Sequence, residues 1–357
     1  MNIKLIFKYY WPHIKRYKKS AILVFVSYAL AVAAGTIGAP LIYKKIIDAI
    51  TNASAPELVS AMLIKTVLIL GGVLVVANVF YRIADYAMAY SQSHALKDIT
   101  DDALARLQRH SYEFFSGVFS GSLVAKMRRY VSAFETMHDN IVFALWMSGL
   151  RLVFAFAVLA YYSWILGAIL FAWVAIYALV IAIFVKKKFK KDLLTAEANS
   201  KVTGILADIL TNILNVKMFS SQDREISYFS EATDIEEKRR RQAWYFQNLQ
   251  FLFQGYFIAF FEFISMFAAV YLWINGTISA GVIILMQIYV FTSFDVVWNI
   301  GRNMTRVMRA VAEAQEMVDV FEKPIEIKDI ENPEDCKIQN GEIKINDISF
   351  AYKKSNP

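Results

Sequence analysis

Residues 141–191 read IVFALWMSGLRLVFAFAVLAYYSWILGAILFAWVAIYALVIAIFVKKKFKK, and this stretch decides the fold. Its two apolar runs, 141–162 and 166–185, each have roughly the twenty residues that an α-helix needs to cross a hydrocarbon core of ~30 Å. Residues 163–165 form the short turn between them, and a cluster of lysines follows the second run. The stretch therefore predicts a transmembrane hairpin whose second helix leaves the membrane on a basic side.

Further apolar runs of the same length occur along the chain. Hydrophobic residues make up 57% of the sequence, and its 27 Phe and 19 Tyr suit contact with lipid and with the bilayer interfaces. We therefore expect an all-α membrane protein with six long transmembrane helices and cytoplasmic extensions. The predicted spans are residues 21–43, 61–81, 141–162, 166–185, 251–273 and 282–299.

Positive charge is unequally divided between the two sides of these spans. The segments on one side carry only Lys44, Lys45 and Lys65, and the remaining Lys and Arg residues, Arg151 excepted, lie on the other side. The positive-inside rule then predicts a multi-pass protein of the cell membrane with both termini in the cytoplasm. The net charge of +7 is spread over membrane-flanking stretches, which argues against a nucleic-acid partner. The single cysteine, Cys336, excludes an internal disulfide, and no Cys/His spacing resembles a metal site.

Long polar helical stretches connect the spans. Residues 1–20 mix aromatic rings with cations, which is typical of an elbow helix lying in the cytoplasmic interface. Helical spacing continues beyond the second and fourth spans, so two helical hairpins are expected to project about 35–40 Å from the bilayer. Their tips are too apolar for free turns, so they either dock on a partner or pack against their own hairpins. The apolar tip residues are Phe114, Phe115, Val118 and Phe119 in the first hairpin and Ile213, Leu214, Val216 and Phe219 in the second.

The pattern changes after the sixth span. Residues 21–322 are expected to form the transmembrane domain, which Lys323-Pro324 ends, and residues 323–340 read as a polar linker. From Gly341 the apolar residues alternate with a period of two, which predicts β-strands. Because a first strand pair cannot fold alone, residues 341–357 are expected to be the short β start of an incomplete α/β domain.

Three ionisable residues fall inside predicted spans. Arg151 and Glu262 each lie about 16 Å from the same face of the membrane, counted at 1.5 Å per residue, and Asp295 lies roughly 20 Å into the sixth span. Charges at such depth usually face a bundle interior and find a partner. Their matched depth suggests an ion pair between Arg151 and Glu262, joined by Asp295. The three residues either line a translocation cavity or lock the spans together.

Five segments of the chain follow one another in a recognisable order. Together they resemble the transmembrane half of a type I ATP-binding cassette (ABC) exporter, and the resemblance covers about residues 4–353. Tyr130 and Asn212 depart from the family pattern, where an acidic residue and a glycine are common. The five segments are Tyr112–Phe115 with Gly121–Leu123, Leu206–Asp223, Asn275–Val282, Ala310–Phe321 and Gly341–Tyr352.

The resemblance implies an assembly larger than this chain. Two such halves, in a homodimer or a heterodimer, would form one transporter with nucleotide-binding domains, ATP and Mg²⁺. The segment 112–119 would dock on one nucleotide-binding domain, and Thr211–Phe219, which includes Asn212, on the opposite one. Tyr352 would stack on the adenine of ATP. The phosphate-binding loop G-x-x-x-x-G-K-[ST] does not occur in these residues, so this stretch alone is not expected to hydrolyse ATP.

The expected function is that of the membrane region of an ATP-driven exporter or lipid flippase. It would move a small lipophilic or amphipathic substrate out of the cytoplasm by alternating access, in contact with membrane lipid. One alternative is an ion-driven secondary transporter, whose spans are typically broken near mid-depth; here only Gly35, Gly38 and Pro40 come close. The other is a membrane receptor or regulator that has the same fold and moves no substrate.

Overall fold

The computed structural model describes residues 2–54, 56–116, 120–325, 327, 341 and 343–348. Six of its helices, some of them containing a π-helical turn, are long and apolar enough to cross a membrane. The protein is therefore an integral multi-pass membrane protein, as predicted, and the secondary structure of the described residues is helical. The six helices are Lys18–Thr51, Ser60–Leu107, Gly121–Tyr162, Trp164–Thr211, Gln222–Ile274 and Ala280–Phe321.

Their order along the chain is simple, with short elements at the bends. In sequence order the elements are α1 (Ile3–Arg16), α2 (Lys18–Ala33), η1 (Ala34–Gly38), α3 (Ala39–Thr51), α4 (Pro56–Leu107), α5 (Tyr112–Ser116), α6 (Ser120–Asp139), η2 (Asn140–Met147), α7 (Ser148–Tyr162), α8 (Trp164–Thr211), α9 (Ile213–Met218), α10 (Gln222–Ile274) and α11 (Ala280–Phe321).

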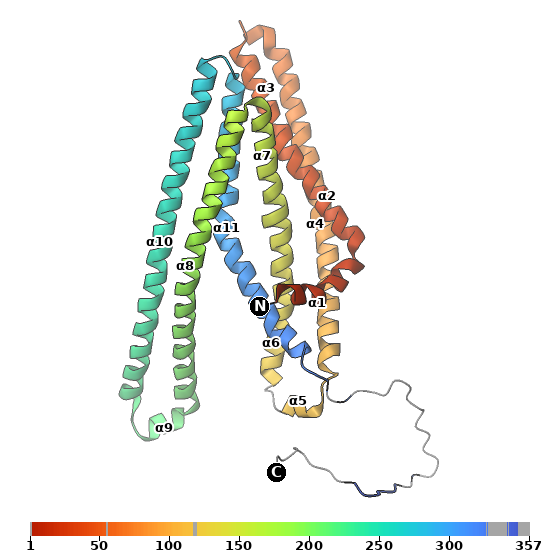
Figure 1. The fold of residues 1–357 in the computed structure, drawn as a ribbon, viewed down its shortest axis with the longest axis vertical. Coiled ribbons are helices and arrows are strands. Elements are labelled where there is room, and N and C mark those ends of the chain that lie inside the picture. Colours follow the sequence, from red (N-terminus) through yellow and green to blue (C-terminus); the bar gives the residue numbers. More distant parts are fainter. Residues whose placement is uncertain are drawn as a thin grey trace.

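The helices run along one long axis and separate into two limbs (Figure 1). One limb consists of α8 and α10 closed by α9, and the other contains α4 and α6 closed by α5. The end with α5 and α9 is called the tip end below. The opposite end is called the turn end, because the connections α3–α4, α7–α8 and α10–α11 lie there. With 53 residues, α10 extends roughly 80 Å, far more than a ~30 Å hydrocarbon core requires.

Helix α11 is the central element. Half of its most apolar window (50%) is buried inside the protein, against 11–33% in the other spans. It packs against α1, α3, α6, α7, α8 and α10. Helices α8 and α10 pack mainly against each other, and a buried hydrogen bond from Gln254 to the Tyr177 hydroxyl (2.6 Å) joins them. The α8–α10 limb thus contacts the rest of the protein through α11 and α7.

The first span contains a π-helical turn, η1, with a physical cause. Pro40 has no backbone N–H and its ring crowds the carbonyl of Thr36, so the regular hydrogen bond between these residues is lost. The freed Thr36 carbonyl accepts a hydrogen bond from the Tyr289 hydroxyl of α11 at 2.8 Å. Tyr289 is fully buried. The helix irregularity therefore becomes an attachment point between the first and sixth spans.

The predicted β start is not supported by the structure. Gly341 and residues 343–348 form no strand, and Ile343 and Ile345 are 85% and 73% exposed. The physical reason is that strands need partners to pair with, and the described residues supply none here. Phe350 and Tyr352 lie outside the described residues.

Candidate functional site

The first tip is α5, which lies between α4 and α6. Phe114 is partly buried: its ring stacks on His110, with 4.4 Å between centroids, and lies 5.3 Å from the Lys323 ammonium nitrogen. Phe115 and Tyr112 are 39% and 86% exposed. One aromatic ring thus fixes the tip to its own helices, while its neighbours leave an apolar face uncovered. The predicted tip residues Val118 and Phe119 lie outside the described residues.

The second tip, α9, also combines one buried residue with several exposed apolar ones. Val216 is its buried residue, whereas Leu214, Met218 and Phe219 are 70%, 69% and 78% exposed. Such a cluster of apolar side chains on a six-residue turn is larger than a solvated bend requires. Each tip thus has one residue packed within its own hairpin and an exposed apolar face, and docking on a partner stays a prediction. The other predicted tip residues, Thr211, Asn212 and Ile213, are also exposed.

Both departures from the family pattern have structural explanations. Asn212 follows α8 with a φ of −98°, a conformation that does not require glycine, and its side-chain amide donates to the Asp208 carbonyl at 3.1 Å. Tyr130 is 2% exposed and stacks on Tyr10, with 4.8 Å between ring centroids. The Tyr10 hydroxyl also donates to the Tyr130 carbonyl at 2.7 Å. Tyr130 therefore fills an apolar core, where a carboxylate would be destabilising.

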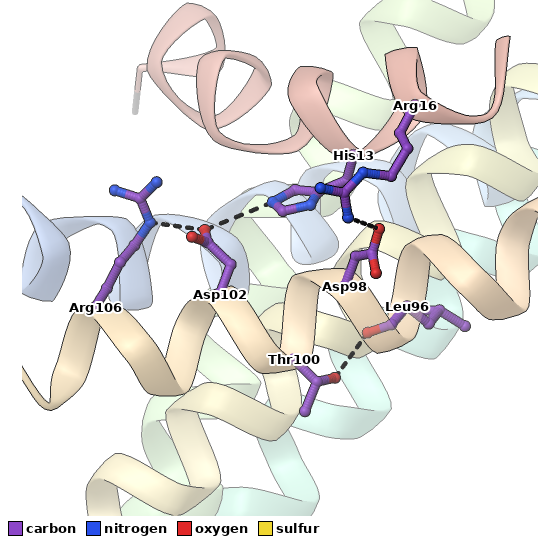
Figure 2. A network of polar contacts seen from close by, with 7 residues as sticks. All are labelled: His13, Arg16, Leu96, Asp98, Thr100, Asp102 and Arg106. Atoms are coloured by element: carbon purple, nitrogen blue, oxygen red, sulfur yellow. Dashed lines mark hydrogen bonds and ion pairs between the residues drawn. The ribbon is translucent and has the colours of Figure 1, made fainter.

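The elbow helix α1 is attached to α4 by polar contacts (Figure 2). Asp98 accepts hydrogen bonds from the Arg16 guanidinium at 2.7 Å and the Tyr17 hydroxyl at 2.9 Å. One turn further along α4, Asp102 lies 3.5 Å from His13 and accepts a 2.7 Å bond from Arg106. Asp98 and Asp102 are four residues apart and therefore share one face of α4. This face of α4 therefore attaches α1, which lies across the long axis of the bundle (Figure 1).

The same elbow helix also contacts the end of α11. The Tyr9 hydroxyl donates to Glu322 at 2.6 Å, and the Arg106 guanidinium lies 4.9 Å from the Tyr9 ring centroid. The Asn2 backbone N–H donates to Gln315 at 2.8 Å. Burial and the hydrogen bond to Glu322 together raise the pKa of Tyr9 to about 12, so the phenol is neutral at physiological pH. The sequence leading out of the sixth span is thus fixed to α1.

The three charges within the spans do not form the predicted pair between Arg151 and Glu262. Arg151 lies 3.9 Å from Asp295 instead, and Glu262 accepts a 2.9 Å hydrogen bond from Gln287. Depth in the membrane is not sufficient for pairing, because α7 packs against α8 and α11 whereas α10 packs against α8, α9 and α11. Each of the two observed contacts joins α11 to a different helix: Arg151 lies on α7 and Glu262 on α10. Asp295, expected as a third member, is the actual partner of Arg151.

Arg151 and Asp295 belong to a polar cavity of about 440 Å³ between η2, α7 and α11. The Asp295 side chain is 69% exposed and that of Arg151 is 32% exposed, so the pair is open to solvent. An adjoining hollow of about 350 Å³ extends the cavity toward the tip end and adds Arg309 and Glu313. The arrangement can receive a polar group between cations and carboxylates. Glu262, by contrast, lines neither of these two hollows.

A nucleotide or metal site is not formed by the described residues. Among them, no group of three His, Cys, Asp or Glu side chains is placed to hold a metal ion. The expected adenine contact, Tyr352, lies outside the described residues. The sequence contains no phosphate-binding loop. Chemistry on ATP would therefore need residues beyond this site.

Sequence reasoning missed the polar contacts between α1 and α4 and the π-helical segment η2. A signal for the first was present: Asp98, Asp102 and Arg106 recur every four residues and therefore share one polar face of the helix. The partner itself, α1, is about eighty residues away in the sequence, as the contact between Arg16 and Asp98 shows. No comparable signal precedes η2.

Six spans, two projecting hairpins with apolar tips and a polar cavity beside the sixth span define the membrane domain of a transporter. The chain belongs to the family described as ABC transporter transmembrane region, which matches residues 22–295. The predicted resemblance to type I ABC exporters is thereby confirmed.

Individual relatives are distant. The chain is 22% identical over 261 residues to an ATP-dependent lipid A-core flippase of Desulfotalea psychrophila, covering 72% of this chain and 45% of that protein. It is 21% identical over 366 residues to an ATM1-type heavy metal exporter of Novosphingobium aromaticivorans, covering 99% of this chain and 58% of that protein. A similar match, 21% over 360 residues, covers 99% of this chain and 59% of the Bacillus subtilis protein YknU, described as an ABC transporter ATP-binding protein. The chain thus spans about half the length of these relatives.

Proposed function

We propose that this chain is the membrane region of an ATP-driven exporter that moves a lipophilic or amphipathic substrate out of the cytoplasm. The observation that carries the proposal is the pair of exposed apolar tips, α5 and α9, at the same end of the molecule. Each ends a long helical hairpin, so a force applied at a tip acts on the spans behind it. The family membership supports the ATP-driven class over an ion-driven carrier.

Nucleotide-binding domains are the proposed partners of the tips. The α5 tip, with the segment 112–119, docks on one such domain, and the α9 tip, residues 211–219, docks on the opposite one. In the complete transporter, Mg²⁺ and ATP bind these domains, and Tyr352 stacks on the adenine ring. Closure of the domains moves the two limbs and changes the accessible side of the cavity. Two transporter halves, identical or different, build the complete pathway.

The orientation follows from charge. Because Lys and Arg are concentrated at the tip end, that end and both termini lie in the cytoplasm of a cell membrane protein. The relatives include a lipid flippase and a heavy metal exporter, which supports transport as the activity but leaves the cargo undefined. Because the cavity is polar, we expect the cargo to be a molecule with a polar end.

Different roles follow for the intramembrane charges. Arg151 and Asp295 line the cavity and contact the polar part of the substrate, since both are partly exposed to it. Glu262 has a structural role, because its bond with Gln287 joins α10 to α11 away from the cavity. Hydrogen bonds between polar side chains of neighbouring spans help to fix the relative position of the helices.

The test uses the full-length transporter reconstituted in vesicles. Leu214→Asp places a charge on the α9 tip, whereas Ile226→Asp makes the same change at a 65% exposed position on the α10 shaft. We expect Leu214→Asp to reduce substrate-stimulated ATP hydrolysis and transport by at least about tenfold, because a buried unpaired carboxylate disrupts an apolar contact. The control should stay within about twofold of the unmodified protein. Equal activity of the two variants would refute the role of the tip.

A further inference from the structure

A second, apolar pocket lies directly beside the polar cavity. Its volume is about 400 Å³, and it is enclosed by α1, the α6–η2 segment and α11, with Phe7, Leu145 and Met304 among its walls. Its lining is almost entirely apolar. Because α1 has the composition of an interfacial helix, the pocket lies at the depth where acyl chains meet headgroups.

The two hollows have one wall in common. Their shared residues come from η2 with the start of α7 on one side and from α11 on the other, and two of them are small. A molecule with its tail in the apolar pocket would therefore reach the polar cavity across a barrier one side chain thick. The residues that line both hollows are Asn140, Ala144, Ser148, Val296 and Asn303.

The wall itself is irregular. Residues Asn140–Met147 form a π-helical segment, and the Ser148 hydroxyl bonds to the Phe143 carbonyl five residues earlier, at 2.9 Å. π-helical insertions are rare and occur frequently at functional sites, because they reposition side chains relative to a regular helix. Here the irregular segment coincides with the boundary between an apolar and a polar hollow.

The polar side contains charges of both signs. Its guanidinium groups are Arg151, Arg306 and Arg309, and its carboxylates are Asp139, Asp295 and Glu313. Arg306 and Arg309 are exposed and take part in none of the ion pairs formed by the described residues. A balanced set suits a ligand that also carries both charges, since a purely anionic headgroup would meet three carboxylates.

We propose that these two hollows form one binding site for a zwitterionic phospholipid of the phosphoethanolamine type. The acyl chain occupies the apolar pocket beneath α1, the phosphate is held by Arg306 and Arg309, and the ammonium faces Glu313 and Asp139. The inference deepens the proposed function and rests on it where the lipid is taken as cargo. Binding alone requires only the geometry of the membrane domain.

The test is photolabelling of the full-length protein in nanodiscs of phosphatidylglycerol without nucleotide. Trace phosphatidylethanolamine or phosphatidylglycerol carries the same diazirine acyl chain, and labelled peptides are mapped by mass spectrometry. We expect the ethanolamine probe to label the η2 and α11 walls about tenfold more than the glycerol probe. Equal labelling by both probes, or labelling spread evenly over the lipid-facing helices, would overturn the proposal.

Variants separate the two halves of the site. Ala144→Phe fills the shared wall, and Met304→Trp fills the pocket from the 50% exposed Met304 position should the first variant fold poorly. Both should abolish the enriched labelling, while Ala172→Phe, at an exposed position on α8, should preserve it. Glu313→Gln should remove the preference for ethanolamine but keep the tail contact, whereas Arg306→Ala should weaken labelling by both probes, because both carry the phosphate. Pocket labelling that survives both filling variants would contradict the assignment.

The outcome is independent of the tip experiment. If Leu214→Asp reduces transport as expected but no enriched labelling is found, the lipid site is rejected and the exporter proposal is kept. Enriched labelling in a protein whose tip variants transport normally would keep the site and reject the coupling. ATP-driven movement of the ethanolamine probe in vesicles then tells cargo from a resident lipid: movement identifies cargo, and bound probe without movement identifies a structural lipid at the same site.

Discussion

Asp48, at the turn end, should be among the residues most important for the stability of this domain. Its carboxylate accepts a hydrogen bond from the Gly281 backbone N–H at 2.8 Å, one from the Ser279 hydroxyl at 3.0 Å and one from the Lys44 ammonium at 2.6 Å. A carboxylate from α3 thus caps the first turn of α11, where backbone N–H groups have no helical partner. The Lys44 ammonium nitrogen also lies 4.7 Å from the ring centroid of Tyr162, so this group of contacts extends to α7.

The magnitude follows from these contacts. The Asp48 and Lys44 side chains are only 19% and 17% exposed, so solvent screens the pair less than it would at the surface. Loss of a helix cap costs about 1 kcal/mol, and loss of a hydrogen bond to a charged group about 1.5–3 kcal/mol. Because these contributions overlap, Asp48→Ala should reduce the free energy of unfolding by about 2–4 kcal/mol.

Gly281 offers a second perturbation of the same contact. A Cβ atom there would lie 2.5 Å from the Lys44 carbonyl oxygen and 2.6 Å from the Asp48 carboxylate. Since the first of these is a backbone atom, α3 and α11 would have to separate. Gly281→Ala should therefore cost about 1–3 kcal/mol, in the range of other overpacked sites.

The assay is reversible unfolding of the purified protein in mixed micelles, followed by tryptophan fluorescence. Asp101→Ala is the matched control, because Asp101 also pairs with a lysine four residues away, but both side chains are more than 60% exposed. The control should cost no more than about 0.5 kcal/mol. If Asp48→Ala were as mild as the control, the proposed capping of α11 by α3 would be wrong.

Two further predictions concern the elbow and the spans. Asp98→Asn should loosen α1, because Arg16 and Tyr17 lose a charged acceptor; we expect faster tryptic cleavage after Arg16 by about threefold, and an unchanged cleavage rate would contradict the attachment. Glu262→Gln should leave the melting temperature within about 2 °C, because the side-chain carbonyl of glutamine still accepts the bond from Gln287. A larger decrease would indicate that the charge itself stabilises the spans.

The sequence was sufficient for those features that depend on position along a helix axis. Runs of apolar residues located all six spans, since crossing a membrane is a matter of length and composition. The tips were predicted because Leu214 and Phe219 are apolar where a polar turn was expected.

Rotation about the helix axes and the choice of neighbours were not predictable in the same way. Arg151 and Glu262 have the same depth but belong to helices that contact different partners, and depth carries no information on that choice. The attachment of Asp48 to Gly281 connects residues 233 positions apart. The π-helical segment η2 depends on how its surroundings pack, and helix propensity describes only local preference.

These attachments together limit how α11 can move. At the turn end Asp48 fixes its first residues to α3, and beyond the membrane Tyr9 fixes Glu322, directly after its last turn, to α1. Between these points lies the polar cavity, where the contact of Arg151 with Asp295 is long at 3.9 Å and open to solvent. Under the proposed coupling, a displacement transmitted from the tips would act on the segment of α11 between these two attachments. Because that segment also forms the wall shared with the apolar pocket, a change in its position would alter access between the two hollows.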